Sequence, residues 1–338
     1  MRIQNVIKSA PGFLKLPYAS LLFMIAPLLI AFLPAPLAYR VACLRGDWRY
    51  RFDRHAREWI MWSLRDVLGD QLSLAERKRV TRDYFRLRAC EAVDIARLAG
   101  RGRALAKLVE IHGLEHIEAA LAAGKGAILA SAHFGSYSSC FSLIGAHGFP
   151  ITVIGRWPSR FDQPIERFFF QLLTQKTVEH HLQRPDIQPR GQLDTAFQAA
   201  AILRNNELIG ICLDAPVTSA DRKRAVSMDF LNRQIWLLPG AITIARLTGA
   251  PVLMMFIRRA PDWRHQIVEI SPPMLLDGDT VTAFRRCLAV VESAIRQNPA
   301  CWSFWCGLSD LVRLGLLSEQ TLKAHKFVAR GWRLTWDQ

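Results

Sequence analysis

His133 stands directly after the small, apolar run AILASA and before a glycine and several hydroxyl residues. An imidazole ordinarily has a pKa of about 6.5, so near neutral pH it can take a proton from a hydroxyl or amine that attacks a carbonyl group. Such a base needs a partner that holds its other ring nitrogen as a donor. The residue types therefore indicate general-base chemistry, with a purely structural histidine as the alternative.

Other polar residues follow apolar runs in the same way. Arg156 follows ITVIG, Asp214 follows LIGICL, and Arg258 and Arg259 end the run PVLMMFIRR. In an open sheet of parallel strands, ligands bind beyond the carboxyl ends of the strands, so these side chains are expected at one edge with His133. The alternatives are a solvated strand-end arginine for Arg156 and a turn or helix cap for Asp214.

The hydroxyl cluster Ser136, Ser138 and Ser139 raises the alternative of a serine hydrolase. The G-x-S-x-G elbow of that class is absent, and the histidine precedes the serines instead of following them. A metal site is not expected, because His180 and His181 have no cysteine or carboxylate at zinc-ligand spacing. The seven cysteines are odd in number and form no C-x-x-C pair, which favours reduced thiols.

The elements that must position these residues are visible in the hydrophobic pattern. The runs AILASA, ITVIGR, LIGICLDA, PVLMMFIRR and RHQIVEISP are typical of buried strands. Longer stretches with helical spacing lie between most of them, and another runs from Thr280 to Pro299. This alternation predicts an α/β fold with a mostly parallel, twisted sheet flanked by helices on both faces.

The N-terminal part of the chain differs in character from the rest. No charged residue occurs from Leu16 to Tyr39. This run reaches the roughly 20 residues that a helix needs to cross a bilayer, but its internal prolines also fit a kinked or interfacial helix. A membrane anchor is expected here, with a cleaved signal peptide and a buried core helix as alternatives.

The charge of the chain restricts its partners. The 338 residues carry a formal net charge of +15, with a mean hydropathy of +0.10. A basic and apolar-rich chain suits anionic lipid or an acidic carrier protein, whereas nucleic-acid binding would rest on charge alone and is not expected. The expected organisation is an anchor or interfacial helix (1–40), a basic helical region (41–112), an α/β domain (113–315) and a helical tail (316–338).

The ordered motifs resemble the late acyltransferases of lipid A biosynthesis and the phosphatidylinositol mannoside acyltransferases. HFGSYS is similar to the family's H-x-x-x-x-E/D motif, and LIGICLDAP to its strand that ends in aspartate. MDFLNRQIW is similar to another family segment, with Asn232 where glycine is usual. NPACWSFWCGL matches the closing P-x-x-W-x-x-W element through Pro299, Trp302 and Trp305, whose tryptophans are expected to be core or interfacial aromatics.

The resemblance implies a fold like that of the glycerolipid acyltransferases. It also implies transfer of a fatty acyl group from an acyl-carrier-protein or coenzyme A thioester to a hydroxyl or amine of a membrane lipid. No cofactor is expected besides this thioester, and the expected location is the cytoplasmic face of the bacterial inner membrane. His133 would be the general base, and the expected substrate-binding positions are Gly135, Arg156, Asp214 and Arg258.

One departure from the family motif concerns the partner of His133. Ser138 occupies the position where the motif has its carboxylate. A hydroxyl can accept the imidazole hydrogen bond, but it supplies no negative charge. We expect Ser138 to be the orienting partner of a slower enzyme; a borrowed acid such as Asp214 is a second hypothesis. The third hypothesis is a non-catalytic descendant that binds lipid or partners an assembly.

Overall fold

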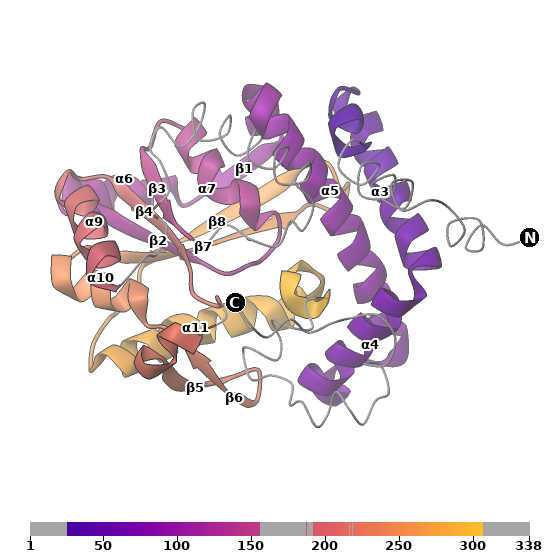
Figure 1. The fold of residues 1–338 in the computed structure, drawn as a ribbon. Coiled ribbons are helices and arrows are strands. Elements are labelled where there is room, and N and C mark those ends of the chain that lie inside the picture. Colours follow the sequence, from indigo (N-terminus) through magenta and orange to yellow (C-terminus); the bar gives the residue numbers. More distant parts are fainter. Residues whose placement is uncertain (1–25, 156–186, 188–191, 216, 218, 307–338) are drawn as a thin grey trace, which may run out of the picture.

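A six-stranded sheet forms the centre of the computed structural model, which describes residues 26–155, 187, 192–215, 217 and 219–306 (Figure 1). Its strands lie in the order β1-β8-β7-β2-β4-β3. All neighbouring pairs are parallel except β7 with β8, which confirms the predicted mostly parallel sheet. The bounds are β1 (Val109–His112), β2 (Ala127–Ser131), β3 (Ile151–Ile154), β4 (Leu208–Cys212), β7 (Val252–Arg259) and β8 (Gln266–Pro273).

The strand β2 shows why both faces of the sheet need helices. All five of its residues are buried, and its four apolar residues alternate between two hydrophobic clusters. Ala127 and Leu129 pack with α5, α6 and α7, whereas Ile128 and Ala130 pack with α9, α10 and α11. The helical bounds are α5 (Leu74–Ala106), α6 (Leu114–Ala122), α7 (Tyr137–Ala146), α9 (Gln192–Arg204), α10 (Gly240–Thr248) and α11 (Thr280–Gln297).

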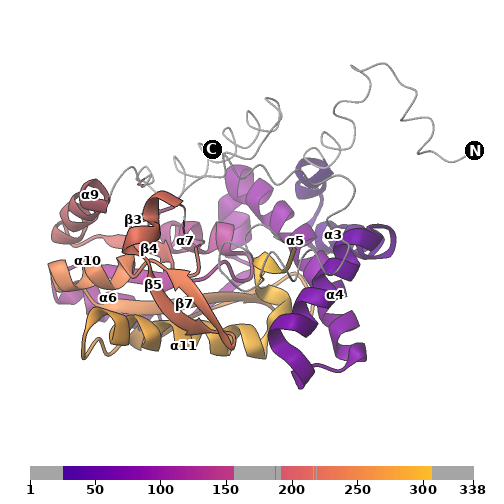
Figure 2. The ribbon, with the colours of Figure 1, turned by 60° about the horizontal axis from the view of Figure 1, so that its bottom comes forward.

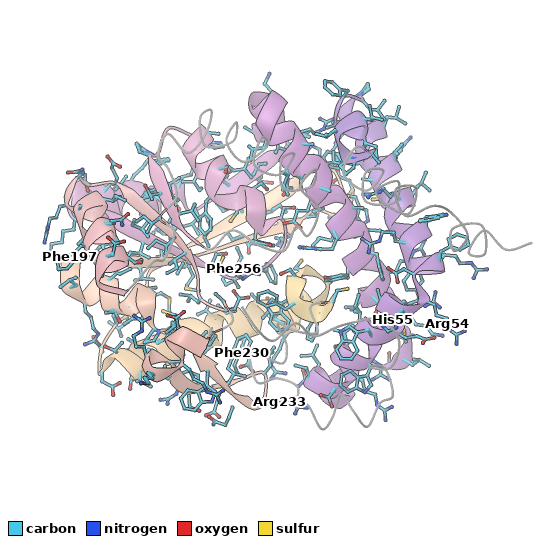
Figure 3. The ribbon with its side chains drawn as sticks, viewed as in Figure 1. Arg54, His55, Phe197, Phe230, Arg233 and Phe256 are labelled. Atoms are coloured by element: carbon cyan, nitrogen blue, oxygen red, sulfur yellow. The ribbon has the colours of Figure 1, made fainter. Side chains whose placement is uncertain are left out.

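A two-stranded hairpin, β5 (Val226–Phe230) with β6 (Arg233–Leu237), covers part of the hydrophobic cluster that contains Ile128 and Ala130. Phe230 lies in that cluster, and the half-buried Phe256 of β7 packs against it (Figure 3). The turn residues Leu231 and Asn232 have φ values of 52° and 62°. Asparagine tolerates this left-handed conformation better than most residues, which explains how it can stand where the family usually has glycine.

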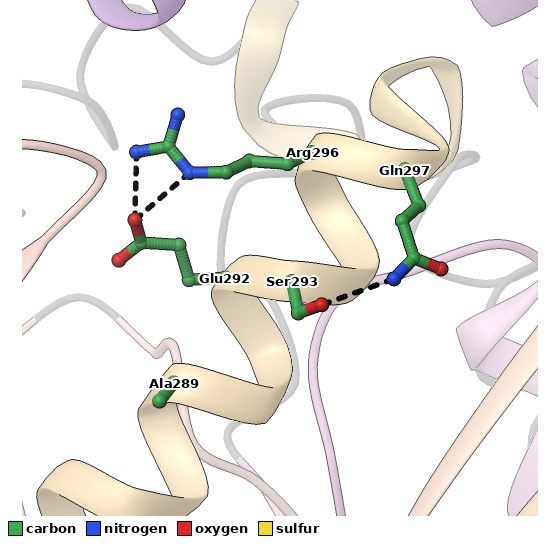
Figure 4. A pocket seen from close by; sticks show the side chains of 5 residues that line it. All are labelled: Ala289, Glu292, Ser293, Arg296 and Gln297. Atoms are coloured by element: carbon green, nitrogen blue, oxygen red, sulfur yellow. Dashed lines mark hydrogen bonds and ion pairs between the residues drawn. The ribbon is translucent and has the colours of Figure 1, made fainter.

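Helix α11 holds the hairpin turn in place. The Glu292 carboxylate accepts a hydrogen bond from the Leu231 N–H at 3.0 Å, and Arg296 donates to the Asn232 side chain at 3.1 Å. Glu292 and Arg296 also pair with each other along an open surface hollow on this helix (Figure 4). The polar groups of this hollow already bind one another and the hairpin. We therefore interpret the hollow as part of the contact between α11 and the hairpin, and not as a ligand site.

Within the described part of the chain, α3 (Ala35–Phe52), α4 (Arg54–Leu68) and α5 precede the sheet, with the short turn η1 (Gly69–Gln71) between α4 and α5. Helix α5 begins with a capping box, in which the side chains of Ser73 and Glu76 accept hydrogen bonds from each other's backbone N–H groups. Figures 1 and 2 show α3 and α4 at the opposite end of the molecule from α9 and α10.

Among the residues that the structure describes, no helix is both long and apolar enough to cross a bilayer. Much of the expected anchor lies in residues 1–25, outside the described part of the chain, and so does the expected tail over 316–338. The remaining short elements are η3 (Ser219–Arg224), η4 (Pro299–Cys301) and η5 (Ser303–Cys306).

Candidate active site

The central strands β2 and β4 bring the predicted histidine and aspartate together. These strands are parallel neighbours, and Ser131 at the end of β2 lies opposite Cys212 at the end of β4. Two residues beyond this pair, the segment after β2 reaches His133 and the segment after β4 reaches Asp214. Although 81 positions separate them in the sequence, the His133 Nδ1 and Asp214 Oδ1 atoms are 2.8 Å apart.

The hydrogen bonds of Asp214 define the role of each ring nitrogen. Its buried carboxylate accepts from the His133 backbone N–H, at 3.0 Å to each oxygen, and Oδ2 also accepts from Trp302 Nε1 at 2.8 Å. An ionised carboxylate can only accept, so Nδ1 of His133 carries the proton and Nε2 is left as an acceptor. The His133 side chain is 22% exposed, so the ring is not sealed in the core.

The segment after His133 has a backbone that only glycine fits. Gly135 has a φ of 65°, and a Cβ atom there would lie 1.7 Å from the Ile257 carbonyl oxygen. The Gly135 N–H donates to the Cys301 carbonyl at 2.8 Å, and its own carbonyl accepts from Arg88 at 2.6 Å. These contacts tie the loop to β7, to η4 and to α5, so the position of His133 is set from several sides.

Aromatic residues of the closing element and of α7 lie against the imidazole. The Phe304 ring lies 4.6 Å from the His133 ring, and the Tyr137 ring meets it edge-on at 4.7 Å. The Ser303 N–H donates to the His133 carbonyl at 2.9 Å, and the Tyr84 hydroxyl of α5 donates to the Ser303 carbonyl at 2.8 Å. The element therefore holds both the ring and the backbone of His133.

A buried ion pair lies beside this loop. Arg259 at the end of β7 pairs with Asp94 of α5, which also accepts hydrogen bonds from the hydroxyls of Tyr39 and Ser136. Burial raises the pKa of Asp94, and the Arg259 charge partly offsets this effect. Burial lowers the pKa of Arg259, but the Asp94 charge, together with the interactions with Cys90, Tyr39 and Cys43, outweighs burial, and the pKa is raised. We therefore interpret Arg259 as a charged structural group.

The structure does not gather every predicted site residue. Arg258 pairs with Glu269 of β8 at 2.9 Å across the antiparallel β7–β8 pair of the sheet. Arg156 lies outside the described residues. Ser138 belongs to α7, but its side chain is outside the described part of the structure. Predictions for the last two positions therefore stay predictions.

A third polar side chain at this edge is Cys212. Its Sγ and the ligand atoms of His133 and Asp214 lie within 4.8 Å of one another, as metal ligands can. Burial, followed by the Asp214 charge, raises the pKa of the Cys212 thiol well above its ordinary value, which disfavours the thiolate that a metal prefers. Both Asp214 oxygens also already accept hydrogen bonds, so we assign no metal to this trio.

Trp302 is the contact that the sequence did not reveal. It lies 88 positions from Asp214, and both tryptophans of the closing element are fully buried in the core, in line with the expected core aromatics. A buried indole N–H usually finds a hydrogen-bond acceptor, so the sequence did indicate that Trp302 would have one. The sequence contained nothing that identified this acceptor as the carboxylate beside His133.

Comparisons with known proteins cover nearly all of the described structure. A family model described as "Bacterial lipid A biosynthesis acyltransferase" matches residues 7–306. A protein of Haemophilus influenzae named lipid A biosynthesis acyltransferase is 26% identical over 274 residues, which are 80% of this chain and 81% of the relative. The range matched by the family model includes His133, Asp214 and Trp302.

Proposed function

Because the chain belongs to the bacterial lipid A biosynthesis acyltransferase family, it is an acyltransferase that acts on a lipid-like acceptor, and we propose that His133 is its general base. The family membership confirms the predicted resemblance and favours an enzyme over the non-catalytic alternative. The observation that carries the role of His133 is the 2.8 Å contact between its Nδ1 and Asp214, which leaves Nε2 available as a base.

In the proposed reaction, Nε2 of His133 takes the proton of the acceptor hydroxyl as the oxygen attacks the thioester carbonyl carbon. The new carbon–oxygen bond forms and the carbon–sulfur bond breaks. The imidazolium then returns the proton to the leaving thiolate. Asp214 accepts the hydrogen bond from Nδ1–H throughout and stabilises the imidazolium by its charge. Among the hypotheses for Ser138, this assigns the orienting role to Asp214 as the borrowed acid.

The donor is proposed to be an acyl-carrier-protein or coenzyme A thioester, with no further cofactor. The donor and acceptor differ in solubility, because the acceptor is a membrane lipid whereas carrier-bound acyl groups are in the cytoplasm. A site on the cytoplasmic face of the inner membrane would give the enzyme access to both. This location agrees with the basic and apolar-rich composition of the chain.

The surface of α3 supports contact with a membrane. Four large apolar residues at positions 37, 44, 48 and 52 are exposed, with fractions of 48% to 67%, and their spacing places them on one face. The exposed Arg40 and Arg51 lie on the same helix. We call Leu37, Leu44, Trp48 and Phe52 the apolar stripe of α3. An apolar face accompanied by arginines is typical of helices that lie in the lipid interface.

The test is an acyl-transfer assay with the full-length purified chain. Radiolabelled palmitoyl-CoA and palmitoyl–acyl carrier protein are offered separately with a detergent-solubilised Gram-negative lipid extract. We expect label in lipid from at least one donor and a loss of about 10³-fold or more in His133→Ala. Undiminished transfer by His133→Ala would remove His133 from the mechanism. Complete absence of transfer by the wild type would favour the non-catalytic alternative.

A further inference from the structure

Trp302 completes the hydrogen bonding of the Asp214 carboxylate. Its Nε1–H donates to Oδ2 at 2.8 Å, while the His133 ring donates to Oδ1, so each oxygen has a side-chain donor of its own. Rotation of the carboxylate would break at least one of these bonds. We propose that Trp302 is a positioning residue: its indole N–H fixes the Asp214 carboxylate, and the carboxylate in turn orients the His133 ring as a base. This inference rests on the proposed function of the His133–Asp214 pair.

Trp302 is itself held rigidly enough for this role. Its side chain is fully buried, and its ring meets those of Phe230, Phe304 and Trp305 edge-on at 4.8 to 6.2 Å. Its backbone forms a bridge with Phe134, the residue that follows His133. One short segment therefore fixes the backbone next to the base and also the carboxylate that orients the base. A donor on a rigid support loses little freedom when it binds, which favours precise orientation.

The neighbouring Trp305 separates this role from ordinary packing. It is also fully buried, it contacts Trp302, and its Nε1–H donates to the Pro299 carbonyl at 2.6 Å. The two tryptophans thus share a cluster, a burial state and a satisfied N–H group. They differ in the acceptor, which is a carboxylate beside the base for Trp302 and a backbone carbonyl for Trp305.

The experiment compares Trp302→Phe with Trp305→Phe in the full chain, using the transfer assay with labelled palmitoyl thioesters. Both changes remove an N–H and keep an aromatic ring. A hydrogen bond to a charged group is worth more than a neutral one, so Trp302→Phe is expected to lower kcat about 10-fold to 100-fold with KM nearly unchanged. Trp305→Phe is expected to lower kcat less than about 3-fold, because its acceptor does not touch the proposed base.

A double-mutant cycle gives a readout that a purely structural residue would not move. If Trp302 acts through the carboxylate, Trp302→Phe should cost almost nothing further in an Asp214→Asn background. Benzothienylalanine at position 302, in which sulfur replaces the indole N–H, keeps the ring shape and should reproduce the loss of Trp302→Phe. This second variant preserves the test if phenylalanine leaves a cavity that prevents folding.

Two results would overturn the inference. One is an equal loss of kcat in the two phenylalanine variants, and the other is an undiminished effect of Trp302→Phe in the Asp214→Asn background. Either result would make Trp302 a packing residue only. Failure of the proposed function has a different signature, because wild-type transfer would then survive His133→Ala.

Discussion

At the scale of single residues, the two nitrogens of the His133 ring have different environments, and this difference predicts which neighbours affect the rate. Asp214 holds Nδ1 at 2.8 Å, so Asp214→Asn should lower kcat by about 10²-fold to 10⁴-fold through loss of charge and of the correct tautomer. Ser138→Ala should stay within about 3-fold of the wild type, because the carboxylate already supplies the acceptor. Steady-state transfer rates check both variants, and a Ser138→Ala loss as large as that of Asp214→Asn would restore Ser138 as the orienting partner.

Gly135 offers a second test at this scale. Alanine there would combine a φ of 65° with a Cβ placed 1.7 Å from the Ile257 carbonyl oxygen, so the loop after His133 must move. We expect Gly135→Ala to reduce the free energy of unfolding by more than about 2 kcal/mol and to abolish most activity. Gly148→Ala is the matched control, since its φ is 91° but no atom lies within 4 Å of the added Cβ.

Urea unfolding and transfer assays decide between these outcomes. Gly148→Ala should lose about 1 kcal/mol of stability, from the backbone conformation alone, and keep its activity. An equally mild Gly135→Ala would mean that the loop can shift without disturbing His133.

The residues of the site were only partly predictable from the sequence. His133 and Asp214 each follow a buried apolar strand, so their presence at one sheet edge was predictable. Their pairing depends on the neighbouring register of β2 and β4, which the sequence pattern does not contain. The family motif predicts Ser138 as the partner, whereas the geometry supports Asp214. Trp302 carried no local sign of its acceptor.

At the scale of elements, Asp47 fastens α3 to α5. Its carboxylate accepts hydrogen bonds from both Arg82 and Arg86 at 2.7 to 2.9 Å. The hydrogen bond from Arg82 is the largest cause of a pKa well below the usual range for Asp47, and burial opposes it. A depressed pKa means that this stabilisation is present above the unfolded pKa of about 3.9 and is lost as the pH falls through the folded value.

Asp47→Asn should therefore lower the free energy of unfolding by about 1–2 kcal/mol at pH 7. The difference from the wild type should shrink as the pH falls below about 4, since the Asp47 carboxylate of the unfolded chain then takes up a proton before the folded one, whose pKa is lower, does so. Urea unfolding at pH 7 and at pH 3 measures this. Glu58→Gln is the control, because its pair with Arg54 lies on the exposed surface of one helix. A constant difference at both pH values would contradict a charged clamp.

The elements differ in how clearly the sequence predicts them. All five expected strands are present, and β2, β3, β4 and β7 come from apolar runs that the sheet largely buries. Strand β1 was not predicted, since its sequence VEIH is short and half polar and forms no apolar run. The hairpin β5–β6 was also not predicted, because its turn is Leu231–Asn232 and not the Asn-Gly pair that usually signals such a turn.

At the scale of the whole molecule, one end carries the surface that suits a membrane. The apolar stripe of α3 lies at this end, next to α4, which begins with Arg54 and His55 (Figure 3). Phe197 on α9, at the other end, is also exposed, by 67%, and no other large apolar residue is exposed among the described side chains of that helix. The two ends therefore offer a matched comparison of exposed aromatic residues within one chain.

The double variant Trp48→Ser/Phe52→Ser is expected to bind anionic vesicles at least about 10-fold more weakly than the wild type. Each aromatic ring that leaves lipid for water costs about 1.5–3 kcal/mol when its burial is complete, and these two rings are 62% and 65% exposed in the free protein. Phe197→Ser should bind as the wild type does. Sedimentation with phosphatidylglycerol-containing vesicles measures the partition, and rising salt should weaken the contribution of the arginines while leaving that of the rings. Equal binding by all three proteins would mean that α3 lies away from the lipid and that any membrane contact of this enzyme is made by other residues.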